Sequence, residues 1–103
     1  MKRLVIYLSE SQRHGLRPLW REVIDALHKH RLAGATATRG LMGFGHTGKL
    51  HEGLSPDAPP DLPVTVEAID EDAAIDRALP DVDALVSEGL VAISDVDVIL
   101  YKG

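Results

Sequence analysis

The densest group of residues with chemical potential is an arginine followed by closely spaced glycines. Arg39 precedes Gly40, Gly43 and Gly45. Arginine forms paired, charge-assisted hydrogen bonds with phosphate, and glycines let backbone N–H groups approach an anion. The glycine segment follows a strand and opens a loop rather than a helix, so it does not match the dinucleotide-binding fingerprint. The segment predicts an anion-binding strand end, with two alternatives open: a plain strand end with a bulge, and an intersubunit salt bridge from Arg39 to an acidic residue.

Other side chains with catalytic or metal-binding chemistry form weaker patterns. His46 and His51 share one segment, with Glu52 adjacent. A metal site needs three or four converging ligands, so no metal is expected. A second group lies near the N-terminus but shows no oriented pairing of nucleophile and base; it consists of Ser9, Glu10, Ser11 and His14. Glu10 is open to a functional role or a plain charge before the helix. The sequence therefore predicts no catalytic residue and a protein that is not an enzyme.

Composition excludes several functional classes. The 103 residues include no cysteine, which excludes a disulfide framework, a thiolate metal site and a cysteine nucleophile. The net charge of −5 argues against nucleic acid as the partner. Residues 1–51 carry nine Lys/Arg and three Asp/Glu, whereas residues 52–103 carry two and thirteen. This split between +6 and −11 favours a head-to-tail contact between copies or an anion site, with plain solvated surface as the alternative.

The chain reads as one domain, 1–103, without a targeting segment. Its start, MKRLVIYLSE, has a basic beginning, but the apolar run is too short for a signal peptide. No apolar run reaches the roughly 20 residues that cross a bilayer. We expect a cytoplasmic protein.

Hydrophobic periodicity predicts the elements that position the arginine and glycines. Strands are expected at 4–8, 35–44 and 62–69 and within 91–101; helices are expected at about 16–30 and from 70 to Gly89. The stretch 45–61 reads as a long loop. The order strand, helix, strand, strand, helix, strand predicts an α+β, ferredoxin-like β-α-β-β-α-β fold. Its four-stranded antiparallel sheet would carry two helices on one face.

One face of this sheet would lack a cover. Leu4, Ile6 and Leu8 should share one face of the first strand, and Val64, Val66 and Ala68 should share one face of the third. Val5, Tyr7 and Ile99 are candidates for the other face, which would be too apolar for open water. Oligomerisation through that face is the expected remedy.

The two predicted helices carry further expectations. Leu16 should begin the apolar face of the first helix, and Trp20 should lie in the core or an interface. Arg17 and Arg21 should form a solvated helix face. Asp70 can cap the second helix. Pro80 should kink that helix or divide it.

The motifs together resemble a known family. The run GATATRGLMGFG at 34–45 is similar to that of the PII-like signalling proteins. More closely, it resembles an uncharacterised PII-like family often encoded beside, or fused to, fluoride-channel proteins. Further residues at 7, 10, 17–20, 62–64 and 88–91 fall where that family has similar ones. The resemblance covers nearly the whole chain.

The resemblance implies a trimer that binds adenine nucleotides in clefts between subunits. Residues 46–61 would take the place of the T-loop, which changes shape with the ligand and docks onto a channel, transporter or enzyme. The implied ligand is ADP, ATP, AMP or a cyclic nucleotide. The cleft residues that this carries onto the chain are Arg39, Gly43, Phe44, Gly45 and His46, with Gly89 across the cleft.

The chain departs from typical PII proteins at two places. Glu88 stands in the loop where those proteins carry a lysine for the phosphates, and it would repel a phosphate. No tyrosine lies between Tyr7 and Tyr101, so the tyrosine that is modified in the T-loop is missing. Two other functions stay open: an enzyme that processes nucleotides or phosphoesters in the same cleft, and a structural or metal-tolerance trimer without a nucleotide.

Overall fold

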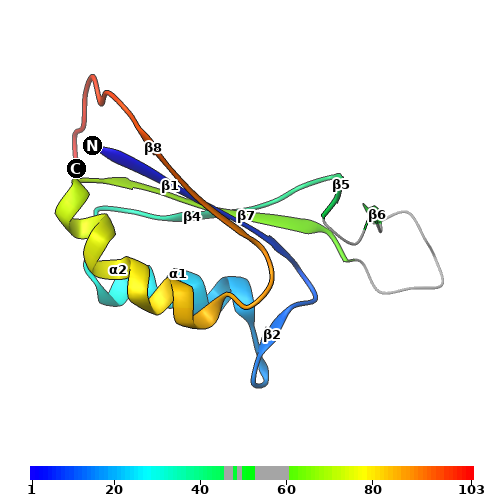
Figure 1. Ribbon diagram of the computed structural model, residues 1–103. Helices are drawn as coiled ribbons and strands as arrows, with labels where there is room; N and C mark the ends of the chain where they lie inside the picture. The colour runs from blue at the N-terminus through cyan, green and yellow to red at the C-terminus, as the bar shows by residue number, and fades with distance from the viewer. Residues whose placement is uncertain (46–47, 49, 53–60) are drawn as a thin grey trace.

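The computed structural model describes residues 1–45, 48, 50–52 and 61–103. Four antiparallel strands form one sheet in the order β4-β7-β1-β8 (Figure 1). Both helices lie on one face of this sheet. The bounds are β1 Lys2–Ser9, α1 Leu19–Lys29, β4 Thr36–Arg39, β7 Pro63–Asp70, α2 Asp72–Leu85 and β8 Leu90–Asp95. The predicted α+β fold is confirmed.

The core lies between the sheet and the two helices. Leu4, Ile6 and Leu8 alternate along β1 and are buried, as predicted, together with Val64, Val66 and Ala68 of β7. The helices contribute Leu19, Val23 and Leu27 from α1 and Ile75, Ala78 and Val82 from α2. Each fully buried Leu, Ile or Val stabilises the fold by about 1.5–3 kcal/mol. The packing of one sheet face on two amphipathic helices therefore explains why this sequence adopts the fold.

The sheet face away from the helices is mixed rather than wholly apolar. On it an ion pair joins Arg3 Nε to Glu67 Oε1 at 2.6 Å. Val5, expected on this face, is buried, whereas Tyr7 is 49% exposed. Ile99, also expected here, is exposed but lies beyond β8, outside the sheet. The apolar part of this face therefore centres on Tyr7, toward the edge formed by β8.

A small hairpin that the sequence analysis missed precedes α1. Its strands are β2, Arg13–His14, and β3, Arg17–Pro18. Gly15 has a φ of 63°, a left-handed conformation that suits a tight turn. Leu16, predicted on the apolar face of the helix, is instead fully exposed at the tip. That prediction was wrong because the turn at Gly15 places Leu16 in the hairpin, although the helical periodicity extends back to it.

Helix α1 accordingly starts at Leu19, three residues later than expected. Pro18 occupies the N-cap position with extended ψ, and its ring cannot donate a backbone hydrogen bond. Arg17 therefore lies on β3 rather than on a helix face. Its guanidinium pairs with Glu22 at 3.0 Å and Asp25 at 2.9 Å.

The second predicted strand is divided. β4 ends at Arg39, and the chain leaves the main sheet to form β5, Met42–Phe44, which pairs with β6, Leu50–Glu52. The strand β6 falls inside the expected loop 45–61, so that loop was predicted too long. Most of the T-loop-like segment, including His46, lies outside the described residues.

Helix α2 is one continuous helix through Pro80, so the predicted division does not occur. Fully buried Ala78 and Val82 flank the proline and hold this stretch on the core. Asp70 is not the cap, because Glu71 occupies the N-cap without a side-chain hydrogen bond. The Asp70 carboxylate instead accepts the backbone N–H groups of Ala33 and Glu71, each at 2.7 Å. The helix ends at Leu85 rather than at Gly89.

The last strand lies earlier than expected. β8 pairs with β1 from Leu90 opposite Tyr7 to Asp95 opposite Lys2, and 96–103 has no regular structure. The Val96 N–H donates to the carbonyl of Met1 at 3.2 Å, so the chain ends lie together (Figure 1). Among the described residues no helix is long and apolar enough to span a membrane.

Candidate functional site

Four chain segments meet at one end of the main sheet. β1 and β4 both run antiparallel to β7, so Glu10, just after β1, and Arg39, at the end of β4, lie at the same end. The residues that enter β7 and β8 lie there too: Leu62 and Gly89. β4 ends at Arg39, whereas the sequence predicted a strand that continues to residue 44. The T-loop-like role of residues 46–61 stays a prediction.

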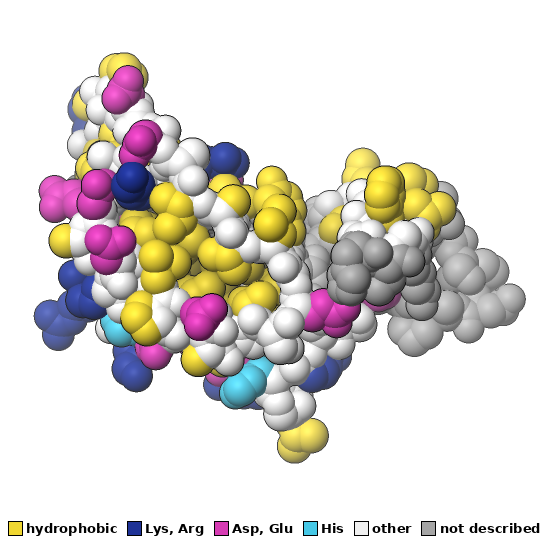
Figure 2. All heavy atoms as spheres, viewed as in Figure 1, with side chains coloured by type: hydrophobic (Ala, Val, Ile, Leu, Met, Phe, Trp, Pro, Cys, Tyr) yellow, Lys and Arg dark blue, Asp and Glu magenta, His cyan; other side chains and the backbone are white. Residues whose placement is uncertain are grey.

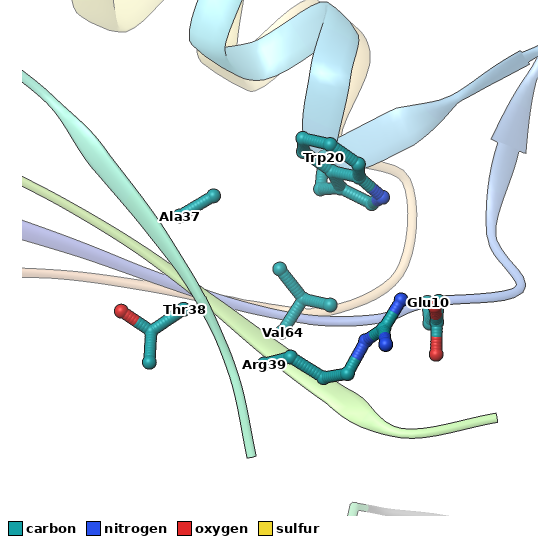
Figure 3. A pocket seen from close by; sticks show the side chains of 6 residues that line it. All are labelled: Glu10, Trp20, Ala37, Thr38, Arg39 and Val64. Carbon is teal, nitrogen blue, oxygen red and sulfur yellow. Dashed lines mark hydrogen bonds and ion pairs between the residues drawn. The ribbon is translucent and has the colours of Figure 1, made fainter. Parts of the chain in front are cut away.

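Arg39 is paired within the chain. Its guanidinium Nη2 donates a hydrogen bond to Glu10 Oε1, reaching across β7 between their strands (Figure 3). Glu10 Oε2 also accepts the Leu62 N–H at 3.4 Å. The Arg39 side chain remains 63% exposed, compared with 21% for Glu10. The pair therefore holds Arg39 in place while most of its side chain stays open to solvent, where an anion can approach.

A hollow of about 240 Å³ lies beside this pair, under the edge strand β4. It is lined by Glu10, Trp20, Ala37, Thr38, Arg39 and Val64. In Figure 3 the Ala37 and Val64 side chains point toward Trp20, from the first turn of α1, while Thr38 points to the other side of the sheet. The floor of the hollow is apolar, and the charged pair stands at its side.

The glycines after Arg39 have a packing role in the structure. A Cβ atom at Gly40 would lie 2.8 Å from Pro63 Cγ, and one at Gly43 would lie 3.2 Å from the same atom. The Gly40 N–H donates to the Pro63 carbonyl at 2.7 Å, which extends β4 by one bond. Close approach of two chain segments thus accounts for both glycines. Their contact with a phosphate stays a prediction, as does that of Gly45, which has open space around it.

The position of Gly89 does not accommodate a residue with a side chain. Its φ of 144° is rarely adopted by residues with a side chain, and a Cβ there would lie 2.7 Å from the Tyr7 carbonyl oxygen. In the same loop the Gln12 side chain donates to the Glu88 carbonyl at 2.7 Å. The loop before β8 is therefore held closely against the end of β1.

The predicted cleft residues do not all meet within one chain. Arg39 and Gly89 lie at the same end of the sheet, but on opposite edges, because β4 and β8 are its outer strands. Phe44 lies on β5 and is 73% exposed. The arrangement brings Arg39 and Gly43 to Pro63, and two strands, β7 and β1, separate them from Gly89.

Sequence reasoning missed the role of Trp20, which periodicity assigned to the core or an interface. It is half-buried, packs against the core, and also walls the hollow. One residue could have indicated the hollow from the sequence: Ala37, a small residue on the edge strand β4. Ala37 lies opposite Val66 in the register of β4 and β7, and Val66 is part of the core. Ala37 therefore lies on the face of the sheet that carries the helices. A small side chain opposite an aromatic one leaves space.

Two ion pairs of the scaffold lower the pKa of a carboxyl group. The Lys2 ammonium, at the far end of β1, holds the pKa of Asp95 below its ordinary value through a hydrogen bond of 2.6 Å. A hydrogen bond of 2.7 Å from the His30 imidazole holds the pKa of Asp81 below its ordinary value and joins α1 to α2. Both pairs act on the scaffold rather than on the hollow.

Comparisons with known proteins identify the family. The profile of DUF190, described as "Uncharacterized ACR", matches residues 1–98. A UPF0166 protein of Aquifex aeolicus is 32% identical over 98 residues, covering 95% of this chain and 92% of that protein. A UPF0166 protein of Methanocaldococcus jannaschii is 30% identical over 103 residues, covering 99% and 93%.

Among solved structures, the chain resembles CPII, a nitrogen regulatory PII-like protein from Thiomonas intermedia K12, bound to ADP, AMP and bicarbonate. The TM-score is 0.67 at 22% identity, and the match covers 94% of this chain and 86% of CPII. The likeness confirms the PII-like fold that the sequence motifs implied. The chain therefore belongs to the DUF190 family and has a PII-like fold.

Proposed function

We propose that this protein is a PII-like regulator that assembles as a homotrimer, binds an adenine nucleotide between subunits, and signals through residues 46–61. Each subunit would contribute one domain, 1–103. The cleft residues are those carried over from the resemblance: Arg39, Gly43, Phe44, Gly45 and His46 on one side and Gly89 on the other.

One observation carries the proposal: the two walls of the predicted cleft lie on opposite edges of one sheet, at the same end. Within a chain Arg39 and Gly89 cannot line one site. A head-to-tail ring brings the β4 edge of one copy to the β8 edge of the next, and it repeats this contact identically until the ring closes. The geometry thus supports a site that exists only between subunits.

The edge formed by β8 supports the assembly. Leu90, Val91 and Ile93 are 57%, 37% and 42% exposed on this short strand, and Tyr101 beyond it is 68% exposed. Figure 2 shows hydrophobic side chains gathered in the middle of the face that carries β8 and α2, with charged side chains around them. Apolar surface of this kind, rimmed by charge, is typical of protein interfaces.

The ligand class rests on Arg39 and on the likeness to CPII. The Arg39 side chain is 63% exposed, and its guanidinium suits a phosphate oxygen. CPII, which shares the fold, was solved with ADP and AMP. The partner of residues 46–61 would be a channel, transporter or enzyme, and the fluoride channels suggested by the family resemblance are the first to test.

The experiment combines light scattering with calorimetry on the same purified protein. The proposal predicts three chains per particle and saturable binding of at least one of ATP, ADP, AMP or a cyclic nucleotide, without product formation. A stable monomer would remove the cleft and contradict the proposal. A trimer that converts the nucleotide would favour the enzyme, and a trimer that binds none would favour a structural role.

A further inference from the structure

The hollow beside Trp20 differs from the predicted cleft, because it forms within one chain and on the helix side of the sheet. Resting on the proposed function, we infer that this hollow, here called the base notch, binds the base of a nucleoside monophosphate whose phosphate lies at Arg39, in the cleft between subunits. The base notch is lined by Glu10, Trp20, Ala37, Thr38, Arg39 and Val64.

The size of the base notch fits part of a nucleotide. Its volume of about 240 Å³ lies below the range of roughly 300–1,000 Å³ that is usual for complete small-molecule sites. Its inner surface is formed by Trp20, Ala37 and Val64, which converge in Figure 3. A flat heteroaromatic ring can stack on an indole and cover apolar side chains, which suits a base and not a phosphate.

From its floor outward, the lining of the base notch changes from apolar to acidic to basic. Val64 at the floor is 4% exposed, the Glu10 side chain is 21% exposed, and Arg39 is 63% exposed. A carboxylate accepts hydrogen bonds from ribose hydroxyls, and a guanidinium binds phosphate. An apolar floor, an acceptor and an outer cation thus match base, ribose and phosphate in sequence.

Glu10 also sets the number of phosphates. Its carboxylate is hydrogen-bonded to Arg39, so a phosphate that binds the guanidinium lies close to a negative charge. Repulsion grows with each phosphate that is added, because every one adds negative charge near the same carboxylate. The site therefore favours a monophosphate, either open or cyclic, over a triphosphate.

Trp20 is the only tryptophan of the chain, so its fluorescence reports directly on the base notch. The probes are AMP, adenosine and ribose 5-phosphate, with excitation at a wavelength that adenine does not absorb. AMP and adenosine should quench the emission, whereas ribose 5-phosphate, which has no ring, should leave it unchanged. Leu16→Ala, at the exposed hairpin tip, is the control and should respond like the parent protein.

Two variants test the contacts by calorimetry. Trp20→Leu removes the stacking surface and should weaken AMP about tenfold, while Trp20→Phe keeps a ring and should restore most of the affinity. Because Trp20 also packs against the core, Ala37→Leu serves as a second variant. Ala37 is exposed on an edge strand, so the larger side chain fills the base notch with little strain on the fold, and it should block AMP and its quenching.

Two results would overturn the inference, and only one of them would also overturn the proposed function. If AMP binds by calorimetry but leaves Trp20 emission unchanged, and Ala37→Leu binds as well as the parent, the base lies elsewhere and the proposed function stands. If no adenine nucleotide binds the parent protein, both the proposed function and the base notch fail. Tighter binding of ATP than of AMP would remove the monophosphate preference.

Discussion

Removing the Arg39 guanidinium should separate ligand binding from folding. Arg39→Ala breaks the pair with Glu10, which involves one side chain that is 63% exposed. Exposed ion pairs contribute about 0.2–1 kcal/mol, so the fold should lose less than about 1 kcal/mol. A charge-assisted contact to a phosphate contributes about 1.5–3 kcal/mol, so nucleotide affinity should fall roughly tenfold to a hundredfold.

Glu10→Gln is the matched variant, since it keeps an oxygen acceptor for Arg39 and removes one negative charge. Two unit charges about 6 Å apart in water repel by about 0.7 kcal/mol. A phosphate monoester carries a charge of about −1.5 to −2 at neutral pH. The repulsion that Glu10→Gln removes is therefore about 1–1.4 kcal/mol. Affinity for AMP should rise roughly sixfold to tenfold, opposite in direction to the effect of Arg39→Ala.

Calorimetry and sedimentation on the same samples distinguish the two roles of Arg39. If Arg39 binds the ligand, the variant stays trimeric while its affinity drops. If Arg39 only bridges subunits, the trimer loosens and affinity falls in step with the trimer fraction. A trimeric Arg39→Ala protein with the affinity of the parent would refute the assignment.

Two further predictions concern the scaffold. Gly89→Ala should lower the free energy of unfolding in urea by about 1–3 kcal/mol, because Gly89 has a positive φ and the new Cβ would contact the Tyr7 carbonyl. Gly34→Ala is the control, since a Cβ at Gly34 meets open space. Equal stability of the two variants would contradict the reasoning. The second concerns pH. The hydrogen bond from His30 lowers the pKa of Asp81 in the fold, so this contribution to stability is present above about pH 4 and is lost as pH falls through the lowered pKa. Asp81→Asn should therefore reduce the loss of thermal stability on acidification, and an unchanged pH profile would count against the pair.

The sheet core could be predicted from the sequence because burial is one-sided there. The alternation of Leu4, Ile6 and Leu8 and of Val64, Val66 and Ala68 gave the correct faces. The last strand could not be located, because β8 is an outer strand whose residues are exposed on both faces, including Leu90 and Ile93. Its register is decided by pairing with β1, a long-range effect that leaves no local pattern.

The start of the first helix shows a conflict between two local signals. Helical periodicity extends back to Leu16, but the positive φ of Gly15 favours a turn. The hairpin prevailed, and Pro18 then marks the boundary. Before α1 the tight turn at Gly15 decides the structure and the helical periodicity does not, because a residue with a positive φ lets the chain reverse its direction.

The candidate site was only partly predictable. The resemblance directed attention to Arg39 and Gly89, but the pairing of Arg39 with Glu10 depends on the order of the strands. β7 separates the two strands from which they come. The hollow beside Trp20 depends likewise on Ala37 lying opposite the helix, which a periodicity argument treats as ordinary packing.

Calorimetric titration of the purified protein with AMP and ADP, at a concentration where light scattering reports its assembly, decides whether a nucleotide site forms between subunits. We expect a trimer that binds one nucleotide per chain, with affinity lost on dissociation to monomers. A trimer that shows no binding of either nucleotide, or a monomer that binds with full affinity, would contradict it.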